Sequence, residues 1–247
     1  MAITVNVKAE YSLNDLSNLR YFGDLLDERL YLINTFRDGE HSWDILDCNG
    51  RKIGQKYKIN VLFIGQTGYG KSSTINTITN TRLMETDSTV SCTREMNCIN
   101  YEIGENLFLS FCDMPGIGEN DTHDSVYKQW YADMFLKCDC VVYILRADQK
   151  NLAIDIAEVN YLRNLDYNKQ IVLALNQVDR VDPVHDTPRG GLFELSDLQE
   201  RNLIDKIKYV SAAFNIPRWN IVAYSSKKKY GIRDLCGVIS RKILSPL

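Results

Sequence analysis

At 247 residues the chain is long enough for one large domain, or for one domain with an accessory segment. A hydrophobic content of 45% and a net charge of −3 indicate a globular protein without a broad basic face, so direct DNA binding is not expected. The seven cysteines are odd in number and irregularly spaced, which argues against a disulfide framework. No apolar stretch approaches the ~20 residues needed to span a bilayer. We therefore expect a cytoplasmic protein with no transmembrane segment.

The N-terminal part, residues 1–56, is predicted to be a helical appendage followed by a linker. Leucine, isoleucine and tyrosine recur through Tyr11–Phe36 at mostly helical spacing, which predicts one or two amphipathic helices. The stretch His41–Lys58 is polar and contains Gly50 and Gly54, which is typical of a linker. The apolar stripe must be buried, either on the main domain or against a partner or second copy, and the sequence leaves both open.

From residue 57 to residue 247, short apolar runs alternate with longer helical patterns. This alternation predicts an α/β domain of three layers, in which helices cover both faces of a mostly parallel sheet. In such sheets ligands bind beyond the carboxyl ends of the strands. The predicted strands are Ile59–Ile64, Met96–Ile103, Leu107–Cys112, Val141–Leu145, Ile171–Leu175 and Ile221–Tyr224, and the predicted helices are Ser72–Thr79, Asp124–Leu136, Leu152–Leu165, Asp197–Phe214 and Ile232–Ile243.

A phosphate-binding loop follows the strand that ends at Ile64. Glycines let its backbone amides turn toward phosphate oxygens, and the helix that follows adds its positive N-terminal end. Lys71 is expected to contact the β- and γ-phosphates and so to serve catalysis, and the Ser72 hydroxyl is expected to bind Mg²⁺. Ser73 completes the predicted phosphate contacts. The loop reads Gly65, Gln66, Thr67, Gly68, Tyr69, Gly70, Lys71, Ser72 and matches G-x-x-x-x-G-K-[ST] at every fixed position.

The next strand carries a second phosphate and metal motif. Leu107–Cys112 is followed by Asp113 and, three residues later, Gly116, which form a D-x-x-G pattern. Asp113 would hold Mg²⁺ through water, and the Gly116 amide would sense the γ-phosphate. A threonine that closes on Mg²⁺ and the γ-phosphate is expected just before Met96. Thr93 has the better spacing for this metal-binding and catalytic role, and Thr89 is the alternative.

Two later segments predict a preference for guanine. Asn176-Gln177-Val178-Asp179 follows a predicted strand and resembles the guanine-specificity motif N-K-x-D, with glutamine in place of the lysine that covers the base. The Asp179 carboxylate can accept hydrogen bonds from the ring NH and exocyclic amine of guanine, whereas adenine offers no such donor pair. Asn176 would brace the loop. After the last strand, Ser225-Ser226-Lys227 resembles the S-A-K loop, in which the amide of the middle residue contacts guanine O6.

These motifs, in this order, resemble the Era-like GTPases of the translation-factor-related class over about Tyr57–Ile243. Within that class the chain looks most like the prophage-associated YfjP group of HSR1-related, 50S-ribosome-binding GTPases. The resemblance implies GTP or GDP and Mg²⁺ as ligands, and a conformational switch driven by attack of water on the γ-phosphate. It also implies an unidentified protein or ribosomal effector, and it leaves a homodimer open. The segment from Asp113 to Gly118 resembles the immunity-related GTPases as well.

The group that would orient the attacking water is not evident from the sequence. Ile117 follows the D-x-x-G glycine, where Ras-like enzymes place a glutamine, and an isoleucine cannot orient water. Glu119 and His123, in the segment that follows, and Arg94, as an arginine finger in a dimer, are candidates, but an ordinary exposed residue is the preferred interpretation of each. Two functions therefore stay open: a slow GTPase switch, and a GTP/GDP-binding module that hydrolyses little and serves as an assembly platform. Asp179 opposes a third alternative, an ATPase or nucleotide kinase.

Overall fold

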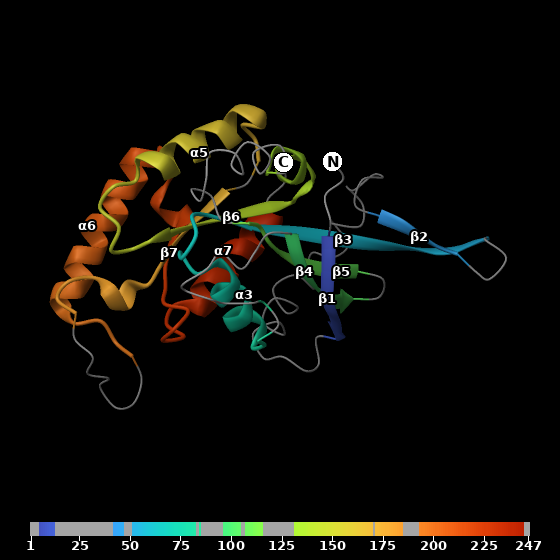
Figure 1. Ribbon diagram of the computed structural model, residues 1–247, viewed down its shortest axis with the longest axis horizontal. Coiled ribbons are helices and arrows are strands. Elements are labelled where there is room, and N and C mark those ends of the chain that lie inside the picture. Colours follow the sequence, from blue (N-terminus) through green and yellow to red (C-terminus); the bar gives the residue numbers. More distant parts are fainter. Residues whose placement is uncertain are drawn as a thin grey trace.

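One mixed sheet organises the described part of the chain in the computed structural model (Figure 1). The structure describes residues 5–12, 42–46, 51–82, 84, 96–104, 107–115, 131–169, 171–184 and 193–244. Its strands are β1 (Val5–Ser12), β2 (Ser42–Leu46), β3 (Lys52–Ile64), β4 (Met96–Gly104), β5 (Leu107–Asp113), β6 (Cys140–Arg146), β7 (Ile171–Asn176) and β8 (Ile221–Ala223).

The sheet is mostly parallel, as the alternation of strands and helices predicts. Its strand order is β1-β4-β5-β3-β6-β7-β8, with β2 paired to β3 outside this path. Strands β5, β3, β6, β7 and β8 run parallel to one another, while β4 is antiparallel to β5 and parallel to β1. All six residues of β7 are buried, and so are the first six of β6. Such continuous apolar runs are typical of parallel strands that are covered on both faces.

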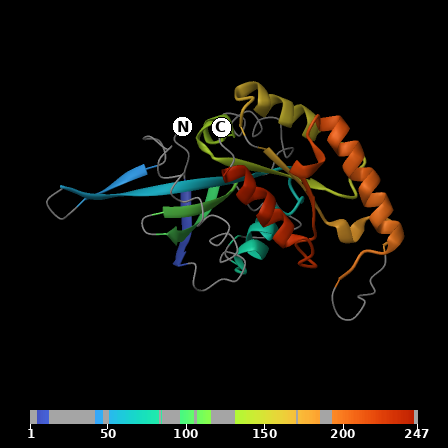
Figure 2. The same cartoon turned by 180° about the vertical axis from the view of Figure 1, so that it is seen from behind.

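Helices cover both faces of this sheet, which confirms the predicted fold class. The long helices are α3 (Lys71–Thr79), α5 (Ala153–Leu165), α6 (Asp197–Phe214) and α7 (Ile232–Leu244). Figures 1 and 2 show α5 and α6 on one face and α3 and α7 on the other. Residues 131–137 are also helical, and the earlier part of the helix predicted at Asp124–Leu136 lies outside the described residues. No helix of the described ranges is long and apolar enough to cross a membrane.

The linker predicted at His41–Lys58 is wrong, because its described residues form two paired strands. β2 pairs antiparallel with the first half of β3, from Ser42 opposite Tyr57 to Leu46 opposite Lys52. This pair extends away from the body of the molecule (Figure 1). Pairing satisfies the backbone hydrogen-bonding groups whatever the side chains are, so polar residues and a glycine did not exclude strands here.

The N-terminus also contributes to the sheet. β1 pairs with β4 from Val5 opposite Met96 to Ser12 opposite Glu102, and it contains Tyr11, where the predicted helical stretch begins. From residue 13 to residue 41 the predicted helices lie outside the described residues. The boundary proposed between residues 56 and 57 falls inside β3.

Candidate functional site

Strand register brings the predicted motifs to one edge of the sheet. Phe63 of β3 lies opposite Asp113 of β5, and Arg146 of β6 lies opposite Asn176 of β7. Because these strands are parallel, the segments that follow them leave the sheet at the same edge. The residues gathered there are the loop Gly65–Ser72, Asp113, the segment Asn176–Asp179 and the segment Ser225–Lys227.

Two glycines let the phosphate loop lie against the strand ends. Gly65 has φ 148° and Gly70 has φ 90°, a region that L-residues with a side chain rarely adopt. A Cβ added to Gly65 would meet the Ile144 carbonyl oxygen at 2.5 Å, and one added to Gly70 would meet Asn176 Nδ2 at 2.5 Å. The close approach of this loop to β6 and β7 therefore requires glycine at both positions.

Lys71 places a buried positive charge inside the loop. It is the first residue of α3 and is 7% exposed. Its Nζ donates hydrogen bonds to the carbonyl oxygens of Gly65 (3.0 Å) and Gln66 (3.3 Å). These bonds hold the ammonium group over the loop backbone, where it can attract an anionic ligand at the helix N-terminus.

Ser72 and Asp113 bring two oxygen atoms together beside the loop. The Ser72 hydroxyl donates a hydrogen bond of 2.5 Å to Oδ2 of Asp113, which ends β5 and is 1% exposed. Hydroxyl and carboxylate oxygens are hard ligands of the kind that Mg²⁺ prefers. The donor set therefore fits the predicted metal. Thr93 and Gly116, the other residues predicted for the metal and γ-phosphate, lie outside the described residues.

Asn176 connects the phosphate loop to the two segments predicted to hold the base. Its side chain is fully buried. Nδ2 donates to the Tyr69 carbonyl oxygen (2.9 Å) and to Ser226 Oγ (3.2 Å), while Oδ1 accepts from the amides of Gln177 (2.8 Å) and Ser226 (3.0 Å). One side chain thus fixes the spacing between the phosphate loop and the loop after β8.

The predicted base-binding residues lie next to this brace. Ser225 Oγ donates a 2.6 Å hydrogen bond to Oδ1 of the half-buried Asp179 and accepts one from the amide of Lys228. The Gln177 side chain donates to the Gly68 carbonyl oxygen at 3.2 Å, and Lys227 is exposed. The amide of Ser226, predicted to contact guanine O6, already donates to Asn176, so a base oxygen would have to share that hydrogen.

Sequence reasoning missed a buried acid beside the phosphate loop. Asp155 of α5 is fully buried and accepts hydrogen bonds from Gln66, Tyr69 and Tyr143. Burial raises the pKa of its carboxyl, and the three hydrogen bonds oppose that effect. The available signal was its position, because Asp155 occupies the apolar stripe that Leu152, Val159 and Leu162 form at helical spacing.

A second set of missed contacts ties α3 to the loop after β8. The hydroxyls of Thr74 and Tyr224 lie 2.7 Å apart, and the Thr77 hydroxyl donates to the Ser226 carbonyl oxygen at 3.2 Å. These bonds link the helix that follows the phosphate loop to the loop that Asn176 braces. The two loops are therefore held together by helix α3 as well as by strand β7.

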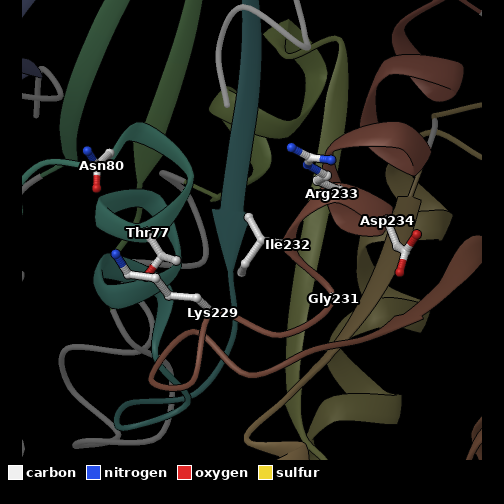
Figure 3. A pocket seen from close by; sticks show the side chains of 7 residues that line it. All are labelled: Thr77, Asn80, Lys229, Gly231, Ile232, Arg233 and Asp234. Carbon is white, nitrogen blue, oxygen red and sulfur yellow. The ribbon is translucent and has the colours of Figure 1, made fainter. Parts of the chain in front are cut away.

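A cavity of about 570 Å³ lies beside these loops (Figure 3). It separates the C-terminal end of α3 from the start of α7, and it contains none of the predicted nucleotide contacts. The cavity is therefore not part of the site at the sheet edge. Its lining residues are Thr77, Asn80, Lys229, Gly231, Ile232, Arg233 and Asp234.

A phosphate loop between β3 and α3, with Asn176 two strands away on β7 bracing the loop after β8, defines a P-loop protein with a Ras-like G-domain architecture. A family model described as 50S ribosome-binding GTPase matches residues 60–177. The Escherichia coli K12 proteins YkfA and YfjP are 26% and 27% identical over 177 residues, which are 72% of this chain and 59% of theirs. The chain thus spans less than two thirds of the length of these relatives.

Solved structures share the same fold. Aquifex aeolicus Era bound to GDP.AlF4⁻ has a TM-score of 0.58 at 18% identity, covering 74% of this chain and 56% of Era. Toc33 from Arabidopsis thaliana in complex with GDP and Mg²⁺ has a TM-score of 0.58 at 13% identity, covering 92% of this chain and 91% of Toc33. The family match and the two Escherichia coli relatives support the resemblance to Era-like P-loop GTPases of the YfjP group, and the solved structures share the fold.

Proposed function

We propose that this chain binds GTP and GDP with Mg²⁺, hydrolyses GTP slowly, and acts as a conformational switch. The observation that carries the proposal is the buried Asn176 side chain, which joins the phosphate loop to the segment that holds Asp179. A phosphate subsite and a base subsite at a fixed spacing are what a nucleotide requires.

Asp179 is the residue proposed to select guanine. Its carboxylate can accept hydrogen bonds from the ring NH and the exocyclic amine of the base. Ser225 donates to Oδ1 and so restricts the rotation of this carboxylate. Adenine lacks the donor pair, and its binding would leave a partly buried carboxylate without compensation for lost water.

Lys71 and the loop amides are proposed to hold the phosphates. The Lys71 ammonium is held by two loop carbonyl oxygens and adds positive charge where the β- and γ-phosphates would lie. Ser72 and Asp113 would hold Mg²⁺, which neutralises phosphate charge when bound. Thr93 is proposed to join them in the GTP state.

The relatives support guanine nucleotide as the ligand class. Era and Toc33 were crystallised with guanine nucleotides, and Myxococcus xanthus EngB, 25% identical over 189 residues, is named a probable GTP-binding protein. Two of the neighbours suggest effectors: one Era structure contains nucleotides of 16S ribosomal RNA, and dimerization is described as important for the GTPase activity of the Toc proteins. An RNA or ribosomal effector and a homodimer are therefore both proposals here.

Replacing Asp179 tests the guanine assignment. Asp179→Asn puts an amide NH₂ or a single neutral oxygen where the carboxylate would accept two hydrogen bonds, so labelled GDP should bind about 2–4 kcal/mol more weakly. Asp182→Asn, three residues further on and exposed, is the matched control and should bind GDP like the wild type. Equal GDP affinity in the Asp179 variant and the wild type would remove the basis for guanine selection.

A binding module with little hydrolysis is the alternative, and Ile117 favours it because this side chain cannot orient water. Single-turnover phosphate release from GTP separates the two functions. For a switch without a supplied catalytic group we expect a rate on the order of 10⁻⁴ to 10⁻² s⁻¹. If phosphate is released no faster than it is from GTP in buffer alone, at both low and high protein concentration, the result would favour the binding module.

A further inference from the structure

The carboxylate of Asp155 is buried against the phosphate loop. Its Oδ2 accepts hydrogen bonds from Nε2 of Gln66 (3.0 Å) and from the hydroxyl of Tyr69 (3.3 Å). Its Oδ1 accepts from the hydroxyl of Tyr143 on β6 (3.1 Å). Asp155 and Tyr143 are fully buried and Tyr69 is 4% exposed, so this is an interior polar cluster that reaches the loop from α5.

The two loop residues involved occupy variable positions of the phosphate-loop pattern. Gln66 and Tyr69 flank the exposed tip formed by Thr67 and Gly68, and both donate to the same carboxylate oxygen. A Cβ added to Gly68 would meet nothing within 4 Å, and the Gly68 carbonyl oxygen accepts a hydrogen bond from the side-chain amide of Gln177. Asp155 therefore restrains, from the interior, the residues on both sides of the exposed tip.

An ionisable group at this position has a cost that packing alone does not explain. Asp155 lies in the apolar stripe of α5 with Leu152, Val159 and Leu162, where an apolar side chain would avoid the desolvation of a charge. Desolvation raises the pKa of this carboxyl, which is the sign of that cost. Unlike an apolar side chain, however, the carboxylate accepts two hydrogen bonds from the phosphate loop.

We infer that Asp155 is a positioning residue that holds the phosphate loop, through Gln66 and Tyr69, in its binding conformation before the nucleotide arrives. A loop that is already ordered loses less conformational entropy when the ligand binds, so affinity rises without any contact between Asp155 and the ligand. This inference rests on the proposed function, because it assumes that the loop binds phosphate groups.

Asp155→Ala should release labelled GDP at least about tenfold faster than the wild type. In the nucleotide-free full chain, the amides of residues 65–70 should also exchange hydrogen faster. Asp155→Asn should restore both readouts to within about threefold of the wild type, because its amide oxygen can accept from Gln66 and Tyr69 while its NH₂ group donates to the Tyr143 hydroxyl.

Tyr143→Phe is the matched control. It removes a hydrogen bond from the other oxygen of the same carboxylate without touching the loop. It should lower the melting temperature while leaving GDP release within about twofold of the wild type. If Tyr143→Phe accelerated GDP release as much as Asp155→Ala, the effect would be general destabilisation and the inference would be wrong.

A second variant keeps the test open if Asp155→Ala does not fold. Gln66→Ala removes the same interaction from the half-buried loop side. It should accelerate GDP release, and adding Asp155→Asn to it should accelerate release no further, because Asp155→Asn leaves the hydrogen-bond acceptor in place. Wild-type release and wild-type amide exchange in Gln66→Ala and in folded Asp155→Ala would overturn the inference. A wild-type chain that binds no GDP would instead overturn the proposed function, and amide exchange would still decide the role of Asp155.

Discussion

Ser72 and Asp113 show how single side chains from distant parts of the chain form one ligand set. Ser72 lies in the first turn of α3, and Asp113 is the last residue of β5. Their oxygen atoms meet at 2.5 Å because β3 and β5 are neighbouring parallel strands, with Phe63 opposite Asp113. The hydroxyl is therefore tied to the acidic residue that is predicted to accompany it on a metal.

Ser72→Ala should remove most of the contribution of Mg²⁺ to GDP affinity. In EDTA the variant and the wild type should bind GDP with similar affinity. In Mg²⁺ the affinity of the wild type alone should rise, by about tenfold, or about 1.4 kcal/mol. Ser73→Ala is the neighbouring control, and its ratio of affinities with and without Mg²⁺ should match the wild type. An unchanged Mg²⁺ effect in Ser72→Ala would exclude Ser72 as a ligand.

Sequence reasoning could place the motif residues but not their supporting contacts. Lys71, Ser72 and Asp113 follow strand ends at fixed spacing, so local patterns were enough to predict their common edge. Asp155 contacts Gln66 across 89 residues of sequence, and no local pattern indicates which acid in a helix turns toward a distant loop. The pairing of the Ser226 amide with Asn176 likewise depends on how two loops meet in space.

At the scale of elements, helix α6 was predicted to the residue and the N-terminal strands were not predicted at all. α6 begins after Ser196, which forms a capping box with Gln199, and ends before Asn215 in a left-handed conformation, so both ends carry local signals. β1 contains Val5, Val7, Ala9 and Tyr11, an alternation typical of a strand. The predicted helical stretch begins at Tyr11, inside this strand.

Deleting residues 1–12 should destabilise the protein, because it removes β1 and leaves β4 as an unprotected edge strand. β4 has fully buried side chains at Cys98, Ile99 and Tyr101, so loss of its neighbour would also expose apolar surface. We expect the melting temperature to fall by at least about 5 °C, or roughly 2 kcal/mol for a chain of this size. An unchanged melting temperature would show that this segment serves a partner and not the sheet.

At the scale of the whole molecule, five parallel strands end at one edge, and the described motifs that are proposed to touch the nucleotide lie there. The three-layer fold was predictable because its strands are continuous apolar runs separated by helices of ordinary length. The pairing of β2 with the first half of β3 was not, because neither segment carries a continuous apolar run, and the pair extends away from the body (Figure 2). The proposed binding of guanine nucleotides therefore depends most on the residues at this sheet edge and on the selectivity of Asp179.

Equilibrium binding of GDP and of ADP to the full chain, measured by calorimetry in the presence of Mg²⁺, tests that selectivity directly. We expect GDP to bind at least about 100-fold more tightly than ADP, a difference of roughly 2.7 kcal/mol, because adenine cannot donate two hydrogen bonds to Asp179. Equal affinities for GDP and ADP would contradict it.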